Sequence, residues 1–110
     1  MNYFRLHVAN YDTACAHLTS SEDGLYGRLL RWYFRSERAI PNTDRIIFRL
    51  ARAQTRAERN AVLRVLQEFF VLQADGWHSV MADKEIAWFQ EKCRKAKASS
   101  EIAVNKRKLR

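Results

Sequence analysis

The chain has 110 residues, 47% of them hydrophobic, and a formal net charge of +8 from 20 Lys and Arg against 12 Asp and Glu. This length suits a single domain, and a chain this apolar, with only three Gly and one Pro, is neither intrinsically disordered nor fibrous. Two distant cysteines, Cys15 and Cys93, exclude a disulfide framework and a four-cysteine zinc site, while a pI of about 10.0 favours anionic partners, nucleic acid first.

The first predicted helix runs from Thr19 to about Glu37. Thr19-Ser-Ser-Glu22 fits a capping box, in which the threonine hydroxyl and the glutamate carboxylate each accept a hydrogen bond from the other residue's backbone amide. A wide apolar arc indicates a central helix packed on more than one side. Gly24 and Gly27 inside it predict close packing against another backbone. The opposite side carries four arginines, interpreted as plain surface: Arg28, Arg31, Arg35 and Arg38.

Two shorter helices follow a break at Pro41. The first covers about 43–53, and its outward stripe of arginines suits phosphate contacts: Arg45, Arg49 and Arg52. The second opens with another capping box, Thr55-Arg-Ala-Glu58, and runs to about Phe69. Its outward face carries four side chains of the types that read base edges: Arg56, Asn60, Arg64 and Gln67. For both faces an ordinary solvated helix surface is the alternative interpretation.

After Phe69 the hydrophobic period changes to that of a β-hairpin. Asp75-Gly76 is a preferred two-residue turn. With this turn as the loop, the predicted pairs are Ala74–Trp77, Leu72–Ser79 and Phe70–Met81. His78 then falls on the polar face of the hairpin. It is a candidate for a phosphate contact, with a plain surface histidine as the alternative.

Asp83 is the predicted N-cap of a last helix, on which Ile86 and Phe89 share a face. Trp88 lies on the opposite side of that helix. We expect the N-terminal segment to cover this tryptophan, through Tyr3, Phe4 and Val8.

The charge excess is concentrated at the C-terminal end. Residues 91–110 carry eight Lys and Arg and two Glu, a net +6, whereas residues 1–90 carry twelve basic and ten acidic residues, a net +2. We predict one domain over residues 1–98 and a basic tail over 99–110, into which the last helix extends and frays. Eight basic side chains in this part are candidates for phosphate contacts, with a solubilising end as the alternative: Lys92, Arg94, Lys95, Lys97, Lys106, Arg107, Lys108 and Arg110.

Three helices, a hairpin and a further helix form the element order of a winged helix. The predicted fold class is therefore mainly α with a small β-hairpin (α+β), winged-helix-like. In that architecture the third helix is presented to the major groove of DNA, and the hairpin is a wing over the backbone.

The order and spacing of several short stretches resemble the YdaU-type domain of unknown function over residues 1–98. The stretches are Met1-Asn-Tyr-Phe-Arg, Tyr11, His17-Leu-Thr19, Glu22-Asp-Gly-Leu-Tyr26, Leu29-Leu30, the Pro41 break, Phe69-Phe70, Asp75-Gly-Trp77 and Asp83-Lys-Glu85. Ala14-Cys15 departs from the family pattern. The resemblance implies a winged-helix domain from bacterial phages and prophages, often the N-terminal module of replication-initiation-like proteins. It implies no catalytic residues.

An enzyme is not predicted. The three histidines lie in different elements without ligand spacing, and neither a glycine-rich phosphate loop nor a nucleophile elbow is present, so no catalytic residue, metal ligand or cofactor is assigned. The aromatic side chains at helical spacing are interpreted as core and not as a base-stacking platform: Trp32, Tyr33, Phe34, Phe69, Phe70 and Phe89.

Two functions stay open. The first is a small phage DNA-binding protein in the bacterial cytoplasm, acting on duplex DNA in replication initiation or its control. The alternative is a protein-interaction module, such as a helicase or loader adaptor or an inhibitor of a host factor, with the same fold but no specific DNA readout. No membrane partner is predicted, because the chain has no 18-residue apolar run. Homodimerisation and single-strand or RNA binding through the tail also stay open.

Overall fold

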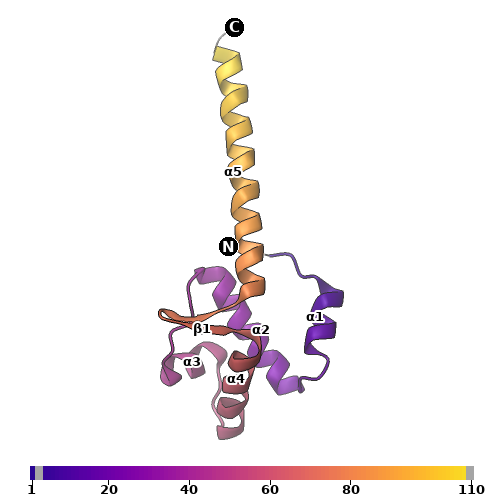
Figure 1. Cartoon of the computed structure of the whole chain (residues 1–110), viewed down its shortest axis with the longest axis vertical. Helices are drawn as coiled ribbons and strands as arrows, with labels where there is room; N and C mark the ends of the chain where they lie inside the picture. The colour runs from indigo at the N-terminus through magenta and orange to yellow at the C-terminus, as the bar shows by residue number, and fades with distance from the viewer. Residues whose placement is uncertain (2–3, 109–110) are drawn as a thin grey trace.

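The computed structural model describes residue 1 and residues 4–108, the last three of these by their backbone alone. The elements in chain order are α1 (Val8–Cys15), α2 (Ser20–Ser36), α3 (Asp44–Ala51), α4 (Arg56–Phe69), β1 (Val71–Gln73), β2 (Gly76–His78) and α5 (Val80–Lys108). Helices α2, α3 and α4 and the hairpin form a small body from which α5 projects (Figure 1). The predicted fold class is confirmed, because the chain is mainly helical with a small β-hairpin. Four helices precede the hairpin in place of the predicted three, since helix α1 was not predicted.

Helix α2 forms the centre of the body, and its capping box is confirmed. The Thr19 hydroxyl accepts a hydrogen bond from the Glu22 amide at 3.1 Å, and the Glu22 carboxylate accepts one from the Thr19 amide at 3.2 Å. The helix ends at Ser36, and Glu37 follows in the left-handed conformation with φ 53°. Six side chains of α2 are buried: Leu25, Tyr26, Leu29, Leu30, Tyr33 and Phe34. This wide buried arc explains why α3, α4 and α5 all pack against the same helix.

Helices α3 and α4 begin and end close to their predicted positions. The second capping box is confirmed, because the Thr55 hydroxyl accepts from the Glu58 amide at 3.1 Å and the Glu58 carboxylate accepts from the Thr55 amide at 2.9 Å. Helix α4 supplies fully buried side chains to the core. The ring of Phe69, at the end of α4, stacks on the ring of Tyr26 of α2 with centroids 4.3 Å apart.

The hairpin forms where predicted, but the predicted register is wrong. The observed pairs are Val71–His78, Leu72–Trp77 and Gln73–Gly76. The two-residue loop is therefore Ala74-Asp75 and not Asp75-Gly76. Gly76 lies in β2, where it takes a conformation with φ 130°.

The reason for this register lies outside the hairpin. The backbone of Ile40 runs antiparallel beside β2 and exchanges two hydrogen bonds with Trp77, at 2.9 and 2.8 Å. A Cβ atom at Gly76 would lie 2.3 Å from the Ile40 carbonyl oxygen. Gly76 is thus required for the close approach of a third extended segment, and the turn is made without it.

The predicted N-cap of the last helix is also wrong, because α5 begins at Val80. The hydroxyl of buried Ser79 accepts a hydrogen bond from the Ala82 amide at 3.1 Å and caps the helix. Asp83 lies inside the first turn of α5, where its carboxylate accepts a hydrogen bond from the Tyr33 hydroxyl at 2.5 Å. The pKa of Tyr33 is raised well above its ordinary value. Burial of the hydroxyl is the larger cause, and the hydrogen bond to Asp83 is the second.

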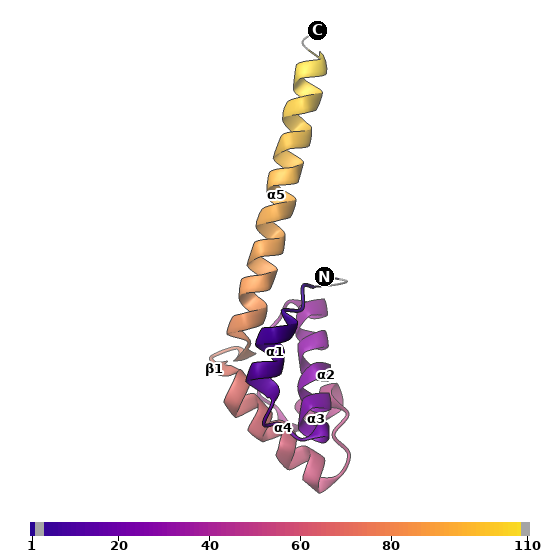
Figure 2. The ribbon, with the colours of Figure 1, turned by 90° about the vertical axis from the view of Figure 1, so that its right-hand side faces the viewer.

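Helix α5 leaves the body soon after its first turns (Figure 2). Its 29 residues span about 43 Å at the usual rise of a helix, and the molecule measures 68 × 30 × 21 Å. The predicted boundary at residue 98 falls inside this continuous helix.

Over the described residues, no helix combines the length and apolarity needed to cross a membrane.

Residues 4–7, named here the N-terminal strap, tie the start of the chain to α2 and α5. The Phe4 ring stacks on the Phe34 ring with centroids 3.9 Å apart. The Arg5 guanidinium donates two hydrogen bonds to the Glu85 carboxylate, both at 3.0 Å, and lies 3.3 Å from the centre of the Trp88 ring. An arginine of the strap therefore contacts Trp88.

The structure does not show the predicted cover of Trp88 by apolar side chains of the N-terminal segment. Phe4 packs on α2, Val8 is exposed, and Tyr3 lies outside the described residues. The tryptophan itself stays 40% exposed. The prediction that the N-terminal segment lies beside Trp88 is correct, but the contact is a cation over the ring, not aromatic packing.

Gly24 and Gly27 do not approach another backbone, contrary to prediction. A Cβ atom at Gly27 would meet nothing within 4 Å, and one at Gly24 would meet only the Arg28 guanidinium, at 3.7 Å. We expect Gly27→Ala to raise the free energy of unfolding by roughly 0.5–1 kcal/mol, because alanine loses less conformational entropy than glycine in a helix. Urea denaturation measures this change, and a lower midpoint for the variant would contradict the open space around Gly27.

Candidate nucleic-acid interface

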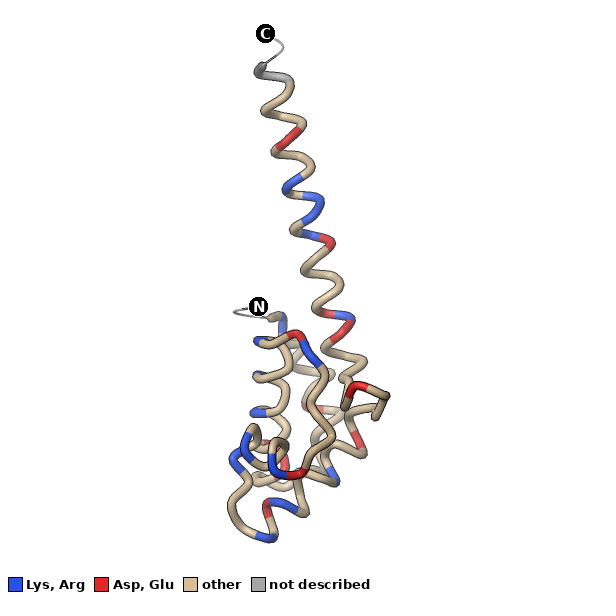
Figure 3. The backbone as a smooth tube through the Cα atoms, turned by 90° about the vertical axis from the view of Figure 1, so that its left-hand side faces the viewer, with Lys and Arg blue, Asp and Glu red and all other residues tan. Residues whose placement is uncertain are grey.

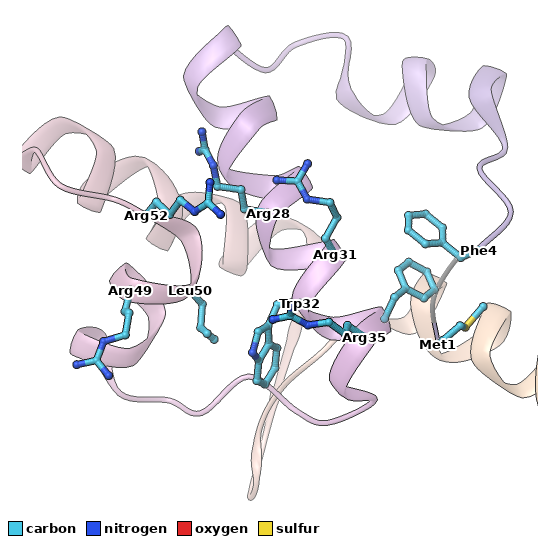
Figure 4. Close-up of a pocket in the computed structure, with 10 residues that line it drawn as sticks. Met1, Phe4, Arg28, Arg31, Trp32, Arg35, Arg49, Leu50 and Arg52 are labelled. Carbon is cyan, nitrogen blue, oxygen red and sulfur yellow. The ribbon is translucent and has the colours of Figure 1, made fainter.

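Five arginines surround one hollow between α2 and α3, and we name this site the arginine basin. Its cations are Arg28, Arg31 and Arg35 from α2 and Arg49 and Arg52 from the end of α3 (Figure 4). The hollow has a volume of about 540 Å³. Its remaining lining residues are Met1, Phe4, Trp32, Phe34 and Leu50. Among the described residues, no Asp or Glu lines it.

The two stripes of arginine converge because α2 and α3 pack side by side. Residues three and four apart share a helix face, so the arginines of α2 lie opposite its buried arc. The Arg28 guanidinium donates a long hydrogen bond of 3.4 Å to the Ala51 carbonyl at the end of α3. Arg52 follows as the C-cap of α3, in the left-handed conformation with φ 59°. Arg28 therefore joins the two helices at the point where Arg52 enters the basin.

A second hollow of about 630 Å³ continues the basin toward α4. Arg49 and Arg52 line both hollows, and Arg45 and Arg59 line the second. The Arg59 guanidinium lies 5.3 Å from the centre of the Phe48 ring. Figure 3 shows the resulting row of basic positions along one edge of α2 and around α3.

The arginines of the two hollows are not neutralised by ion pairs. Within the described part of the chain, the arginines that pair with carboxylates lie elsewhere: Arg5, Arg64 and Arg94. Among the described residues, no carboxylate lies within ion-pair distance of the five guanidinium groups of the basin. A hollow lined by one sign of charge focuses the positive potential, which attracts anionic ligands.

The predicted base-reading face of α4 is exposed but less positive than the basin. Arg56, Asn60, Arg64 and Gln67 all face solvent. The Arg64 guanidinium lies 3.9 Å from the Glu22 carboxylate, and Glu68 on the same helix forms an ion pair with His17. These side chains do not line the basin, so the structure separates the predicted reading face from the main group of cations.

The hairpin, residues 71–78, contains no Lys or Arg that could contact a phosphate. His78 is held by carboxylates, because its Nε2 atom lies 2.6 Å from Asp75 and its Nδ1 atom 3.8 Å from Asp83. The hydrogen bond to His78 lowers the pKa of Asp75. The structure thus engages His78 with Asp75 of the hairpin and Asp83 of α5, and not with the arginines of α3.

The basic side chains of the C-terminal part lie on projecting α5, away from the basin. Lys92, Arg94, Lys95 and Lys97 are exposed. Arg94 donates two hydrogen bonds to Glu91, at 3.0 and 2.6 Å, which lower the pKa of that carboxyl group. The side chains of Lys106, Arg107 and Lys108, and the whole of Arg110, lie outside the described residues.

The sequence interpretation missed the α2 half of the basin. That interpretation treated the arginines of this helix as plain surface, although a spacing of three and four residues already places Arg28, Arg31 and Arg35 on one face. Only the packing of α3 beside that face turns the surface stripe into the wall of a hollow. The five arginines assigned to α3 and α4 were expected at phosphates or base edges, and two of them, Arg49 and Arg52, do lie in the basin.

Among the described residues, no group of three or more His, Cys, Asp or Glu side chains is placed to hold a metal ion. Cys15 is buried and burial raises the pKa of its thiol, while Cys93 is exposed on α5.

Comparison with known proteins agrees with the expected resemblance. A model of the family described as "Protein of unknown function (DUF1376)" matches residues 2–87. The chain is also 32% identical over 110 residues to a protein of Escherichia coli (strain K12) named "Uncharacterized protein YdaU". That alignment covers 98% of this chain but 37% of the relative, so the chain spans little more than a third of that protein's length. No solved structure matches significantly. The chain therefore belongs to the DUF1376 family of proteins of unknown function.

Proposed function

We propose that this protein binds DNA, with duplex DNA as the ligand expected for its winged-helix-like fold, and that the arginine basin makes the main phosphate contacts. One observation supports this most directly: five arginines from two helices surround a hollow that no described carboxylate lines. The guanidinium group matches phosphate geometry and donates two parallel hydrogen bonds to it. A link to phage replication is the further expectation that the family resemblance implies.

The phosphate contacts set the affinity, and a second surface sets any sequence preference. Each phosphate that an arginine neutralises releases condensed counterions, so affinity falls as salt rises. Asn60 and Gln67 on α4 are of the types that read adenine, and Arg56 and Arg64 of the type that reads guanine. In this arrangement the basin holds the backbone of the DNA and α4 faces the base edges.

The test is a DNA titration of a double variant of the basin, Arg49→Gln with Arg52→Gly. Glycine suits position 52, because the left-handed conformation with φ 59° favours it, so the second change removes a cation without loss of stability. We expect the slope of log affinity against log salt to fall by about two, one for each lost phosphate contact. Fluorescence anisotropy of a labelled duplex over roughly 50–200 mM salt measures this slope.

Two matched controls separate the basin from general charge effects. Arg38→Gln removes an arginine near the end of α2 that lines neither hollow, and it should leave most of the affinity. Glu37→Gly repeats the glycine change at the other left-handed position without removing a cation. A duplex that does not bind at low salt, or that binds the double variant as it binds the parent, overturns the proposal and favours the protein-interaction alternative.

A further inference from the structure

We infer that the arginine basin holds one unpaired base of a nucleic-acid strand against Trp32, with the adjoining phosphates at the surrounding arginines. The inference rests on the proposed function and deepens it. A duplex and a single strand can both place phosphates at the arginines, and the inference adds a contact with Trp32 that only a strand with an unstacked base can make.

The basin has two kinds of lining. The arginines form a charged wall, and the remainder is apolar and partly aromatic, from Trp32 of α2, Leu50 of α3 and Phe4 of the N-terminal strap (Figure 4). A site for phosphate alone needs only the charged wall. A nucleotide combines a flat, weakly polar base with an anionic phosphate, and this combination fits both kinds of lining.

Trp32 is a partly accessible residue that lines the hollow. It is half-buried, whereas its neighbours Tyr33 and Phe34 are buried in the core. Among the described residues, no ring stacks on Trp32 and no cation lies over it. The sequence interpretation placed Trp32 in the core because it has helical spacing with core residues. In the structure Trp32 packs against the core and also lines the hollow.

The size of the hollow suits one unpaired base, whereas an intact duplex reaches the basin through its phosphates alone. A hollow of about 540 Å³ falls within the range of about 300–1,000 Å³ of small-ligand pockets. Inside a duplex each base is stacked between its neighbours and presents only its edge, so its face cannot reach Trp32. Single-strand binding sites typically combine a positive groove with aromatic rings on which bases stack.

The decisive experiment compares two single strands that carry the same number of phosphates. One is a thymidine oligonucleotide of about 12 nucleotides, within the ~4–16 nucleotides of known single-strand sites, and the other has abasic sites in place of its central bases. We expect the unaltered protein to bind the thymidine strand roughly 10-fold more tightly at equal salt, because only that strand has bases to stack. The comparison needs no variant and so does not depend on the folding of one.

A set of variants assigns the preference to Trp32. Trp32→Ala should abolish the preference for bases while the remaining phosphate-driven affinity persists, and Trp32→Phe should retain most of it. Trp88→Ala is the matched control, because Trp88 is a 40% exposed tryptophan outside the basin and its removal should leave the preference unchanged. Circular dichroism spectra verify that each variant is folded.

The outcomes distinguish this inference from the proposed function. Equal binding of the thymidine and abasic strands, with affinity still dependent on Arg49 and Arg52, overturns the inference and leaves DNA binding through the basin intact. Absence of binding to any strand or duplex overturns the proposed function itself. Displacement of the thymidine strand by thymidine monophosphate at an equal nucleotide concentration would reassign the site to a free nucleotide and overturn the inference of a strand ligand.

Discussion

Gly76→Ala is expected to lower the free energy of unfolding by about 3 kcal/mol or more, because it combines backbone strain with a steric clash. Gly76 has φ 130°, a region that side-chain-bearing residues rarely adopt. Its Cβ atom would lie 2.3 Å from the Ile40 carbonyl oxygen and 3.0 Å from the Ile40 carbonyl carbon. Backbone atoms cannot move aside as a flexible side chain can. The variant must therefore lose the pairing of Ile40 with Trp77 or distort the wing.

Gly27→Ala is the matched control, since it makes the same chemical change on α2 where the added methyl group meets nothing within 4 Å. Urea denaturation of the two variants should move the midpoint in opposite directions, down for Gly76→Ala and up for Gly27→Ala. If Gly76→Ala unfolds with the midpoint of the parent protein, then Ile40 does not lie against β2, and the explanation given above for the hairpin register is wrong.

Arg5→Ala is expected to lower the free energy of unfolding by about 2 kcal/mol, because it leaves a buried carboxylate without its main partner. The Glu85 side chain is only 10% exposed and accepts both guanidinium hydrogen bonds of Arg5, with His7 as its remaining partner at 3.1 Å. The same change removes the cation over the Trp88 ring. The N-terminal strap should then detach from α5.

The dependence of this effect on pH has a definite sign. The hydrogen bonds from Arg5 hold the pKa of Glu85 below its ordinary value of 4.5 in the folded protein. The stabilisation is therefore fully present above about pH 4.5 and is lost as the pH falls through the lower, folded-state pKa. We expect the stability difference between the parent and Arg5→Ala to be constant near neutral pH and to shrink in acid.

Urea denaturation at several pH values between neutrality and the acid range measures this difference. Arg94→Ala is the matched control, because it removes an arginine that is bonded to the exposed carboxylate of Glu91 on α5. An exposed pair of this kind contributes little, so the control should change stability only slightly. A stability difference for Arg5→Ala that stays the same in acid would show that the Glu85 carboxylate is not the source of the effect.

The local elements of this protein could be predicted closely because their signals are local. Thr19 and Thr55 each cap a helix with a glutamate three residues later, and both helices begin where these pairs place them. Helix α1 lacks such a signal, because His7 at its N-cap makes no side-chain hydrogen bond to the helix and the helix buries only Cys15. Its ties are to distant residues, such as the hydrogen bond of 2.8 Å from Tyr11 to Asp23.

Two errors of prediction, the hairpin register and the N-cap of α5, have a common physical cause, which is competition from a distant segment. Asp75-Gly76 is the better turn by local preference, yet Gly76 is used where Ile40 approaches the strand. Asp83 is an acceptable N-cap, yet its carboxylate bonds to Tyr33 of α2 and Ser79 caps α5 in its place. In each case a contact across the fold outweighs a local preference.

The sequence by itself determined the type of fold, the limits of α2, α3 and α4, and the faces on which the arginines lie, because hydrophobic period and helix caps act within a few residues. Tertiary structure alone decided which of those faces meet. Arg28, Arg31 and Arg35 became a site only when α3 packed beside α2 and brought Arg49 and Arg52 to the same hollow. A helix specifies the directions of its own side chains, but the distance between side chains on two helices depends on how the helices pack.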